Sequence, residues 1–273
     1  MHRAFSNAKI PRVIPQLQLI ESTIPYGLPS MNRFVPVHIR TELIKRLISS
    51  GVSNIYTGNL NCNGPLFGTR DLLLETKDFG YGERTLSASL LTPTMTRSFM
   101  TSGADEMVIP VDLRVPFSAE SSILFKDEIS LARSNGHSVR LQVNGVSHST
   151  EEEFRRLIEH FVFAGITRLS ILDDDGTFTP SFLSLVLHWV KDLVPKDQIA
   201  LGFQQKGLCN IYTAIEEGIT TYHTSLGGLG NYTNTLHLIE FAQKQVLEIP
   251  NLRPFQLRET DRWWKRQIYQ LNK

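Results

Sequence analysis

The chain has 273 residues, of which 41% are hydrophobic and 20% charged, a composition typical of a globular protein large enough for one barrel or two domains. Its 28 Lys and Arg residues against 27 Asp and Glu give a net charge of +1, which provides no excess field for binding nucleic acid or an anionic membrane. No stretch approaches the roughly 18 to 20 apolar residues that a membrane-spanning helix needs.

Cysteine usage and the start of the chain bear on the cellular compartment. Only Cys62 and Cys209 are present, which are too few for a disulfide framework and lack the spacing of a zinc site. Residues 1–9 are mixed and polar, without the apolar core of a secretory signal. We therefore expect a cytoplasmic protein.

Short runs rich in β-forming residues alternate with helical patterns, which is typical of repeated βα units around a parallel sheet. The expected strands are 17–22, 54–58, 85–90, 107–111, 139–143, 168–172, 199–203 and 220–224. Eight parallel strands close a barrel, and no Ser/Gly linker interrupts the pattern. We predict an α/β fold with a single (β/α)8 TIM barrel over residues 1–250 and a C-terminal helical extension over residues 251–273.

Three of the intervening helices have recognisable ends. A stripe of apolar residues predicts a helix over 37–50, which Gly51 would end. Ser149, followed three residues later by Glu152, indicates a capping box at the start of another helix. The pair Thr179 and Pro180 is typical of an N-cap and a first helical residue.

The segment after residue 250 is basic and aromatic, with Trp263 and Trp264 inside a predicted helix over 259–273. The favoured interpretation is a terminal helix that packs its aromatic side on the barrel wall. A dimer contact is the second possibility. Nucleic-acid binding is the least favoured, because the whole chain is nearly neutral.

The segment from Glu21 to Leu28, Glu-Ser-Thr-Ile-Pro-Tyr-Gly-Leu, resembles the Asp-x-Thr-x-Arg-Asp-Gly signature of the DRE-TIM metallolyase superfamily. This family of TIM barrels includes hydroxymethylglutaryl-CoA lyase, isopropylmalate synthase, homocitrate synthase and the pyruvate carboxyltransferase domain. The resemblance covers roughly residues 15–245. Its other matching segments are 51–58, 102–110, 164–176 and 229–234. It implies chemistry at a carbon–carbon bond next to a carbonyl, and it implies a homodimer.

The residues that carry charge in the family differ here. By the resemblance, Pro25 stands where the family has its catalytic arginine, and Tyr26 where it has a metal-binding aspartate. Tyr56 replaces a glutamate, while Gln204 and Lys206 stand in place of a His-x-His pair. A divalent cation needs carboxylate or imidazole ligands, and an ammonium group repels it. We therefore predict no metal and no other cofactor.

The remaining candidate site residues also follow from the resemblance, since TIM barrels work at the C-terminal ends of their strands. Backbone N–H groups of Gly228 and Gly230 would bind a carboxylate or phosphate. The side chains expected to converge at this end are Tyr26, Tyr56, Asp173, Gln204, Lys206 and Asn234.

The first functional hypothesis is a metal-independent lyase-like or aldolase-like enzyme that acts on a small-molecule substrate. Lys206 would polarise a carbonyl or thioester oxygen, or form an imine with a 2-oxo acid. Tyr26 or Tyr56 would transfer protons, and Asp173 would orient Lys206. Alternatively, Lys206 only forms an ion pair with Asp173 or Asp174.

The second hypothesis is a catalytically inactive barrel that binds a ligand or a protein partner. Tyr26 and Tyr56 would then fill the space that a metal and its waters occupy in the family. The two hypotheses predict different barrel mouths. Tyrosine rings that plug the mouth favour the inactive barrel, whereas a cavity with Lys206 at its base favours catalysis.

Overall fold

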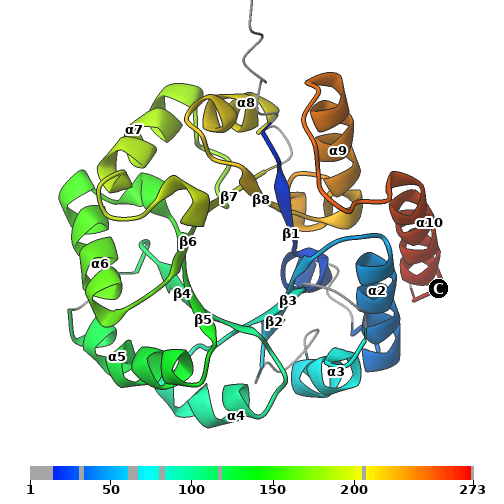
Figure 1. Cartoon of the computed structure of the whole chain (residues 1–273), viewed down its shortest axis with the longest axis horizontal. Coiled ribbons are helices and arrows are strands. Elements are labelled where there is room, and N and C mark those ends of the chain that lie inside the picture. Colours follow the sequence, from blue (N-terminus) through cyan, green and yellow to red (C-terminus); the bar gives the residue numbers. More distant parts are fainter. Residues whose placement is uncertain are drawn as a thin grey trace, which may run out of the picture.

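A computed structural model describes residues 15–30, 34–60, 67–79, 84–115, 119–204 and 207–271. Its eight parallel strands close into a barrel in sequence order, with β8 bonded to β1 (Figure 1). The predicted TIM barrel is therefore confirmed, and every predicted strand overlaps an observed one. The strands are β1 (Gln18–Glu21), β2 (Asn54–Asn59), β3 (Thr85–Ser89), β4 (Glu106–Asp112), β5 (Ser138–Asn144), β6 (Arg168–Asp173), β7 (Ile199–Phe203) and β8 (Thr221–Thr224).

Helices surround the barrel and connect each strand to the next (Figure 1). The α-helices are α1 (Leu28–Ser30), α2 (Val37–Ser49), α3 (Thr69–Thr76), α4 (Thr96–Met100), α5 (Ala119–Ser134), α6 (Glu151–Ala164), α7 (Pro180–Val190), α8 (Leu208–Glu216), α9 (Thr235–Lys244) and α10 (Pro254–Leu271). The shorter helical turns are η1 (Thr23–Gly27), η3 (Pro93–Met95), η4 (Val146–His148), η5 (Lys196–Gln198) and η6 (Leu226–Asn231).

The predicted helix ends are correct at α2 and α7 and shifted by one residue at α6. Gly51, with φ of +85°, follows the end of α2, and the Thr179 hydroxyl accepts from the Phe182 amide at the start of α7. At α6 the capping box consists of Thr150 and Glu153. The Ser149 hydroxyl instead donates to the Val146 carbonyl at 2.9 Å, so the preceding turn uses it and the cap moves one residue on.

The main hydrophobic core lies between the strands and the surrounding helices. Inside the barrel the apolar cluster is small and consists of Ile20, Tyr56, Val108 and Ala200, with Tyr26 packed against it. Much of the remaining interior is polar and buried. The two ends of the barrel therefore differ in the polar side chains that they bury.

The C-terminal helix α10 lies outside the barrel beside α2 (Figure 1). Trp264 is fully buried, and the guanidinium carbon of Arg46 lies 4.7 Å from the Trp263 ring centroid, within cation–π range. The structure confirms that this helix packs its aromatic side on the barrel wall. In the part of the chain that the structure describes, no helix is long and apolar enough to span a membrane.

Candidate functional site at the C-terminal mouth of the barrel

Three tyrosine rings pack together at the C-terminal mouth. Tyr26 in η1 stacks on Tyr232, which follows η6, with ring centroids 4.3 Å apart and an interplanar angle of 17°. Tyr56 of β2 meets Tyr26 edge to face at 5.8 Å. The Tyr26 hydroxyl donates to Oε1 of Gln142 at 2.8 Å. We call these three rings the tyrosine cluster, and it includes both predicted tyrosines.

The position of Tyr26 depends on close contact between η1 and η6. A Cβ atom on Gly230, whose φ is +68°, would lie 2.3 Å from the Tyr26 carbonyl oxygen. A Cβ on Gly27 would lie 2.8 Å from the Leu229 Cβ. Real Cβ atoms do not come this close to other atoms, so both positions need glycine. Gly230, predicted to bind substrate, therefore has a structural role here.

Electrostatics keep the tyrosine cluster neutral. Burial, followed by the nearby Tyr232 and Tyr56, raises the pKa of Tyr26 well above its usual value. Burial likewise raises the pKa of Tyr56 to about 12 and also raises that of Tyr232. The tyrosine cluster offers a divalent cation neutral phenols and one amide oxygen, but no carboxylate or imidazole ligand. Among the described residues, no group of three or more His, Cys, Asp or Glu side chains is placed to bind a metal ion.

A cavity of about 360 Å³ lies at the ends of β6 and β7. It adjoins the tyrosine cluster, because Gln204 pairs with Tyr232 in an isolated β-bridge. The structure brings two of the predicted site residues, Asp173 and Gln204, together in its wall. Lys206 is outside the described residues. The described lining residues are Asp173, Gly176, Phe178, Gln204, Gly207, Asn210 and Asn231.

Asp173 is a buried carboxyl group that accepts a hydrogen bond from the loop that follows it. It is 4% exposed, and its Oδ1 accepts from the Thr177 amide at 2.8 Å. Burial raises its pKa, although the backbone amides of Thr177 and Phe178 act in the opposite direction. A raised pKa makes the carboxylate a stronger base than that of an exposed aspartate.

A charged group missed by sequence reasoning lies at the rim of the mouth. Arg114, just after β4, makes ion pairs with Asp112 at 2.8 Å, Asp174 at 2.6 Å and Asp175 at 2.9 Å. Asp175 also pairs with His148 at 3.0 Å. Asp174, one candidate partner for Lys206, is thus already paired with an arginine. Arg114 and Asp174 are 60 residues apart, so local sequence patterns could not predict their contact.

Asn234 and Gly228 contribute to local structure at this end. Oδ1 of Asn234 accepts from the Leu236 amide at 2.9 Å and caps α9. The Gly228 amide donates to the Ser225 carbonyl at 3.0 Å inside the turn. Their predicted roles in substrate binding remain predictions.

Glu21 is a buried carboxylate at the end of β1 with mainly structural contacts. It accepts from the Thr23 amide at 3.0 Å, from the Thr23 hydroxyl, and from the Thr235 hydroxyl at 2.7 Å. The Leu226 amide is 3.4 Å away. Burial raises the pKa of Glu21. Its contacts connect β1 with η6 and α9.

The fold and this site define a (β/α)8 barrel whose C-terminal mouth combines a neutral tyrosine cluster with a carboxyl-lined cavity. No family model matches the chain. It is 25% identical over 245 residues to the mitochondrial hydroxymethylglutaryl-CoA lyase of Arabidopsis thaliana, in an alignment covering 81% of this chain and 52% of that protein. The chain thus spans about half the length of this curated relative.

Solved hydroxymethylglutaryl-CoA lyases have the same fold. The Brucella melitensis enzyme matches with a TM-score of 0.82 and 20% identity, over 94% of this chain and 99% of that one. The Acinetobacter baumannii enzyme, in complex with coenzyme A and 3-methylmalate, has a TM-score of 0.82 and 18% identity, over 93% and 91% of the two chains. These structural similarities show the shared fold, and the plant sequence match supports the resemblance to the DRE-TIM metallolyase superfamily.

Proposed function

We propose that this chain makes or breaks a carbon–carbon bond next to a carbonyl group, in a 2-oxo acid or an acyl thioester, without a divalent cation. One observation carries the proposal: Asp173 and Gln204 line one cavity at the end of the barrel where TIM-barrel enzymes work. Lys206 lies in sequence between Gln204 and Gly207, two lining residues. The relationship to hydroxymethylglutaryl-CoA lyases supports the reaction class.

Lys206 supplies the positive charge in this proposal. With a 2-oxo acid, its neutral amine attacks the carbonyl carbon, water leaves, and the protonated imine accepts the electron pair of the breaking bond. With a thioester, its ammonium group instead polarises the carbonyl oxygen. Asp173 then holds or returns the proton. The Acinetobacter complex with coenzyme A and 3-methylmalate supports including thioesters among the substrates to be tested.

Reduction with borohydride tests the imine route. The full chain is incubated with pyruvate or other 2-oxo acids, reduced, and mapped by peptide mass spectrometry. We expect an adduct on Lys206 that is lost in Lys206→Arg and kept in the matched variant Lys196→Arg. An adduct absent from the wild type, or equal in both variants, removes the imine route.

The thioester route has its own test. Cleavage of hydroxymethylglutaryl-CoA is measured in excess chelator, and the purified protein is analysed for bound metal. We expect turnover to persist in chelator and to fall in Lys206→Gln. Turnover that requires added magnesium or manganese, or a tightly held stoichiometric ion, contradicts metal independence.

A catalytically inactive barrel that binds a ligand or a protein is the second candidate, and the packing of the Tyr26, Tyr56 and Tyr232 rings against one another supports it. This candidate predicts neither an adduct nor turnover, but saturable binding of coenzyme A or a dicarboxylate, measured by calorimetry.

The proposal also includes a cytoplasmic location and a homodimer, which fluorescence microscopy and analytical ultracentrifugation test. A monomer at micromolar concentration would contradict the dimer.

A further inference from the structure

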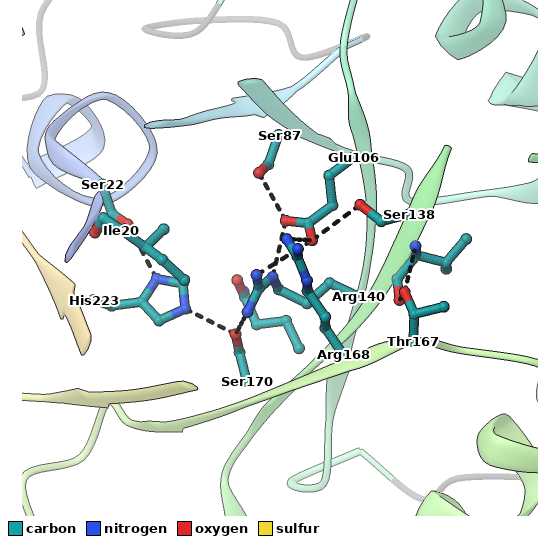
Figure 2. Close-up of polar contacts among 12 residues, drawn as sticks. Ile20, Ser22, Ser87, Glu106, Ser138, Arg140, Thr167, Arg168, Ser170 and His223 are labelled. Atoms are coloured by element: carbon teal, nitrogen blue, oxygen red, sulfur yellow. Dashed lines mark hydrogen bonds and ion pairs between the residues drawn. The ribbon is translucent and has the colours of Figure 1, made fainter. Parts of the chain in front are cut away.

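The N-terminal end of the barrel, opposite the tyrosine cluster, holds a charged network around a buried carboxylate (Figure 2). Glu106 of β4 is 1% exposed. Its carboxylate accepts from Nε of Arg140 at 2.9 Å and from Nη1 of Arg168 at 3.0 Å. The Ser87 hydroxyl donates to it at 2.8 Å. Figure 2 shows both arginine side chains directed at this one carboxylate.

The network has one more positive than negative charge. Two guanidinium groups face a single carboxylate, and Nη1 of Arg140 continues to the Ser170 hydroxyl at 3.2 Å. Ser170 in turn contacts Nε2 of His223 at 2.8 Å. Burial, followed by the charge of Arg140, lowers the pKa of His223 to about 3, so this histidine is neutral. The excess charge therefore comes from the arginines.

A cavity of about 470 Å³ opens next to this network, at the starts of β1, β2 and β3. Arg168 and Arg84 both line it, and no Asp or Glu is among the described lining residues. Nε of Arg84 donates to the Phe79 carbonyl, while its Nη1 is buried and has no hydrogen-bond partner among the described residues. The other polar lining residues are Gln18, Ser53, Asn54, Thr85 and Asn251.

A smaller cavity of about 140 Å³ adjoins the first and shares Gln18, Asn54 and Arg168 with it. Arg140 lines this smaller space, as does Asp197, an acidic residue in η5. The larger cavity is thus the more positive of the two. Arg84 and Arg168 supply this positive charge.

We propose that the larger cavity binds a small dianionic oxyanion, a phosphate monoester or a dicarboxylate, through Arg84 and Arg168. Planar guanidinium groups match the oxygens of carboxylates and phosphates, and two of them balance two negative charges. The cavity volume is in the range of small-molecule sites. The proposal is independent of any reaction at the C-terminal mouth.

Calorimetric titration of the full chain tests this site, with sodium phosphate and sodium succinate as probes, sodium acetate for comparison, and NaCl holding the ionic strength constant. We expect one equivalent of phosphate or succinate to bind at least about tenfold more tightly than acetate. The tighter probe identifies the ligand class. Binding that is no tighter than acetate for both probes overturns the proposal.

Two variants locate the binding. Arg84→Gln should lower the affinity for the tighter-binding probe at least about tenfold, the loss expected for a charge-assisted hydrogen bond. Arg84→Lys, which keeps the charge but not the planar guanidinium, should lose less affinity than Arg84→Gln. Arg262→Gln, which removes the same charge from an exposed pair on α10, is the matched control and should bind like wild type. Wild-type affinity in a folded Arg84→Gln variant overturns the proposal.

Discussion

The two ends of this barrel distribute charge in opposite ways. At the C-terminal mouth the buried side chains include neutral phenols, and the ion pairs of Arg114 lie at the partly exposed rim. At the N-terminal end Glu106 and Arg140 form a buried ion pair, and Arg168, whose side chain is 39% exposed, adds a second guanidinium. Buried charges act in a low dielectric and are weakly screened. The mouth is therefore held mainly by packing, and the opposite end by charge.

Removing the carboxylate at the N-terminal end should have the largest effect. Glu106→Gln leaves Arg140, which is 5% exposed, without its counter-charge. We expect the free energy of unfolding in urea to fall by about 3–5 kcal/mol. Glu240→Gln, in an exposed pair with Arg258 at 3.8 Å, should cost about 0–1 kcal/mol. Equal losses in the two variants would remove the distinction between buried and surface charge.

A subtler change at the mouth should lower the free energy of unfolding by less. Tyr26→Phe keeps the ring in the tyrosine cluster but leaves Oε1 of Gln142, a residue 3% exposed, without its donor. We expect a loss of about 1–3 kcal/mol in unfolding free energy. Tyr212→Phe, at a half-exposed tyrosine on α8, should change it by less than about 0.5 kcal/mol. No difference between the two variants would show that the Gln142 bond does not stabilise the mouth.

Two buried glutamates, one at each end, should give opposite pH dependence. Burial raises the pKa of Glu106, but Arg140, Arg168 and Ser87 outweigh it, and the net pKa lies below 4.5. Its stabilising contribution is present above pH 4.5 and is lost as the pH falls through the folded-state pKa. The pKa of Glu21 is raised above 4.5, so its contribution is present below pH 4.5 and is lost as the pH rises through the folded-state pKa.

Urea unfolding from pH 3 to pH 8 of wild type, Glu106→Gln and Glu21→Gln separates the two contributions. Each difference from wild type should change by up to about 1.4 kcal/mol per pH unit, in opposite directions. If both differences run in the same direction, the contrast between the ends is wrong.

The smallest effect is expected at the rim. Arg114→Gln removes the cation from three carboxylates, but its side chain is 38% exposed and screened by solvent. We expect a loss below about 1 kcal/mol, which shrinks further when NaCl is raised. Thermal unfolding at low and high salt checks this. A loss that is large and independent of salt would mean that the rim is as buried as the N-terminal end.

The barrel itself was predictable because its signals are local. Each signal depends on only a few neighbouring residues. Examples are the runs of β-forming residues, Gly51 at the end of α2 and the Thr179–Pro180 pair at the start of α7. Much of the site was not predictable in this way. Arg168 meets Glu106 across 62 residues, and Tyr232 meets Tyr26 only because η6 packs on η1. The polar Arg140 and Gln142, alternating within β5, were one local sign of a polar interior.

The seam between β1 and β8 has a consequence for how the protein is made. Glu21 near the start of the chain needs Leu226 and Thr235, more than two hundred residues later, to satisfy its carboxylate. During synthesis on the ribosome, β1 can pair with β2 early, but its pairing with β8 must wait until the residues of β8 have emerged. Contacts so distant in sequence slow folding, and closure of the ring should be its late step.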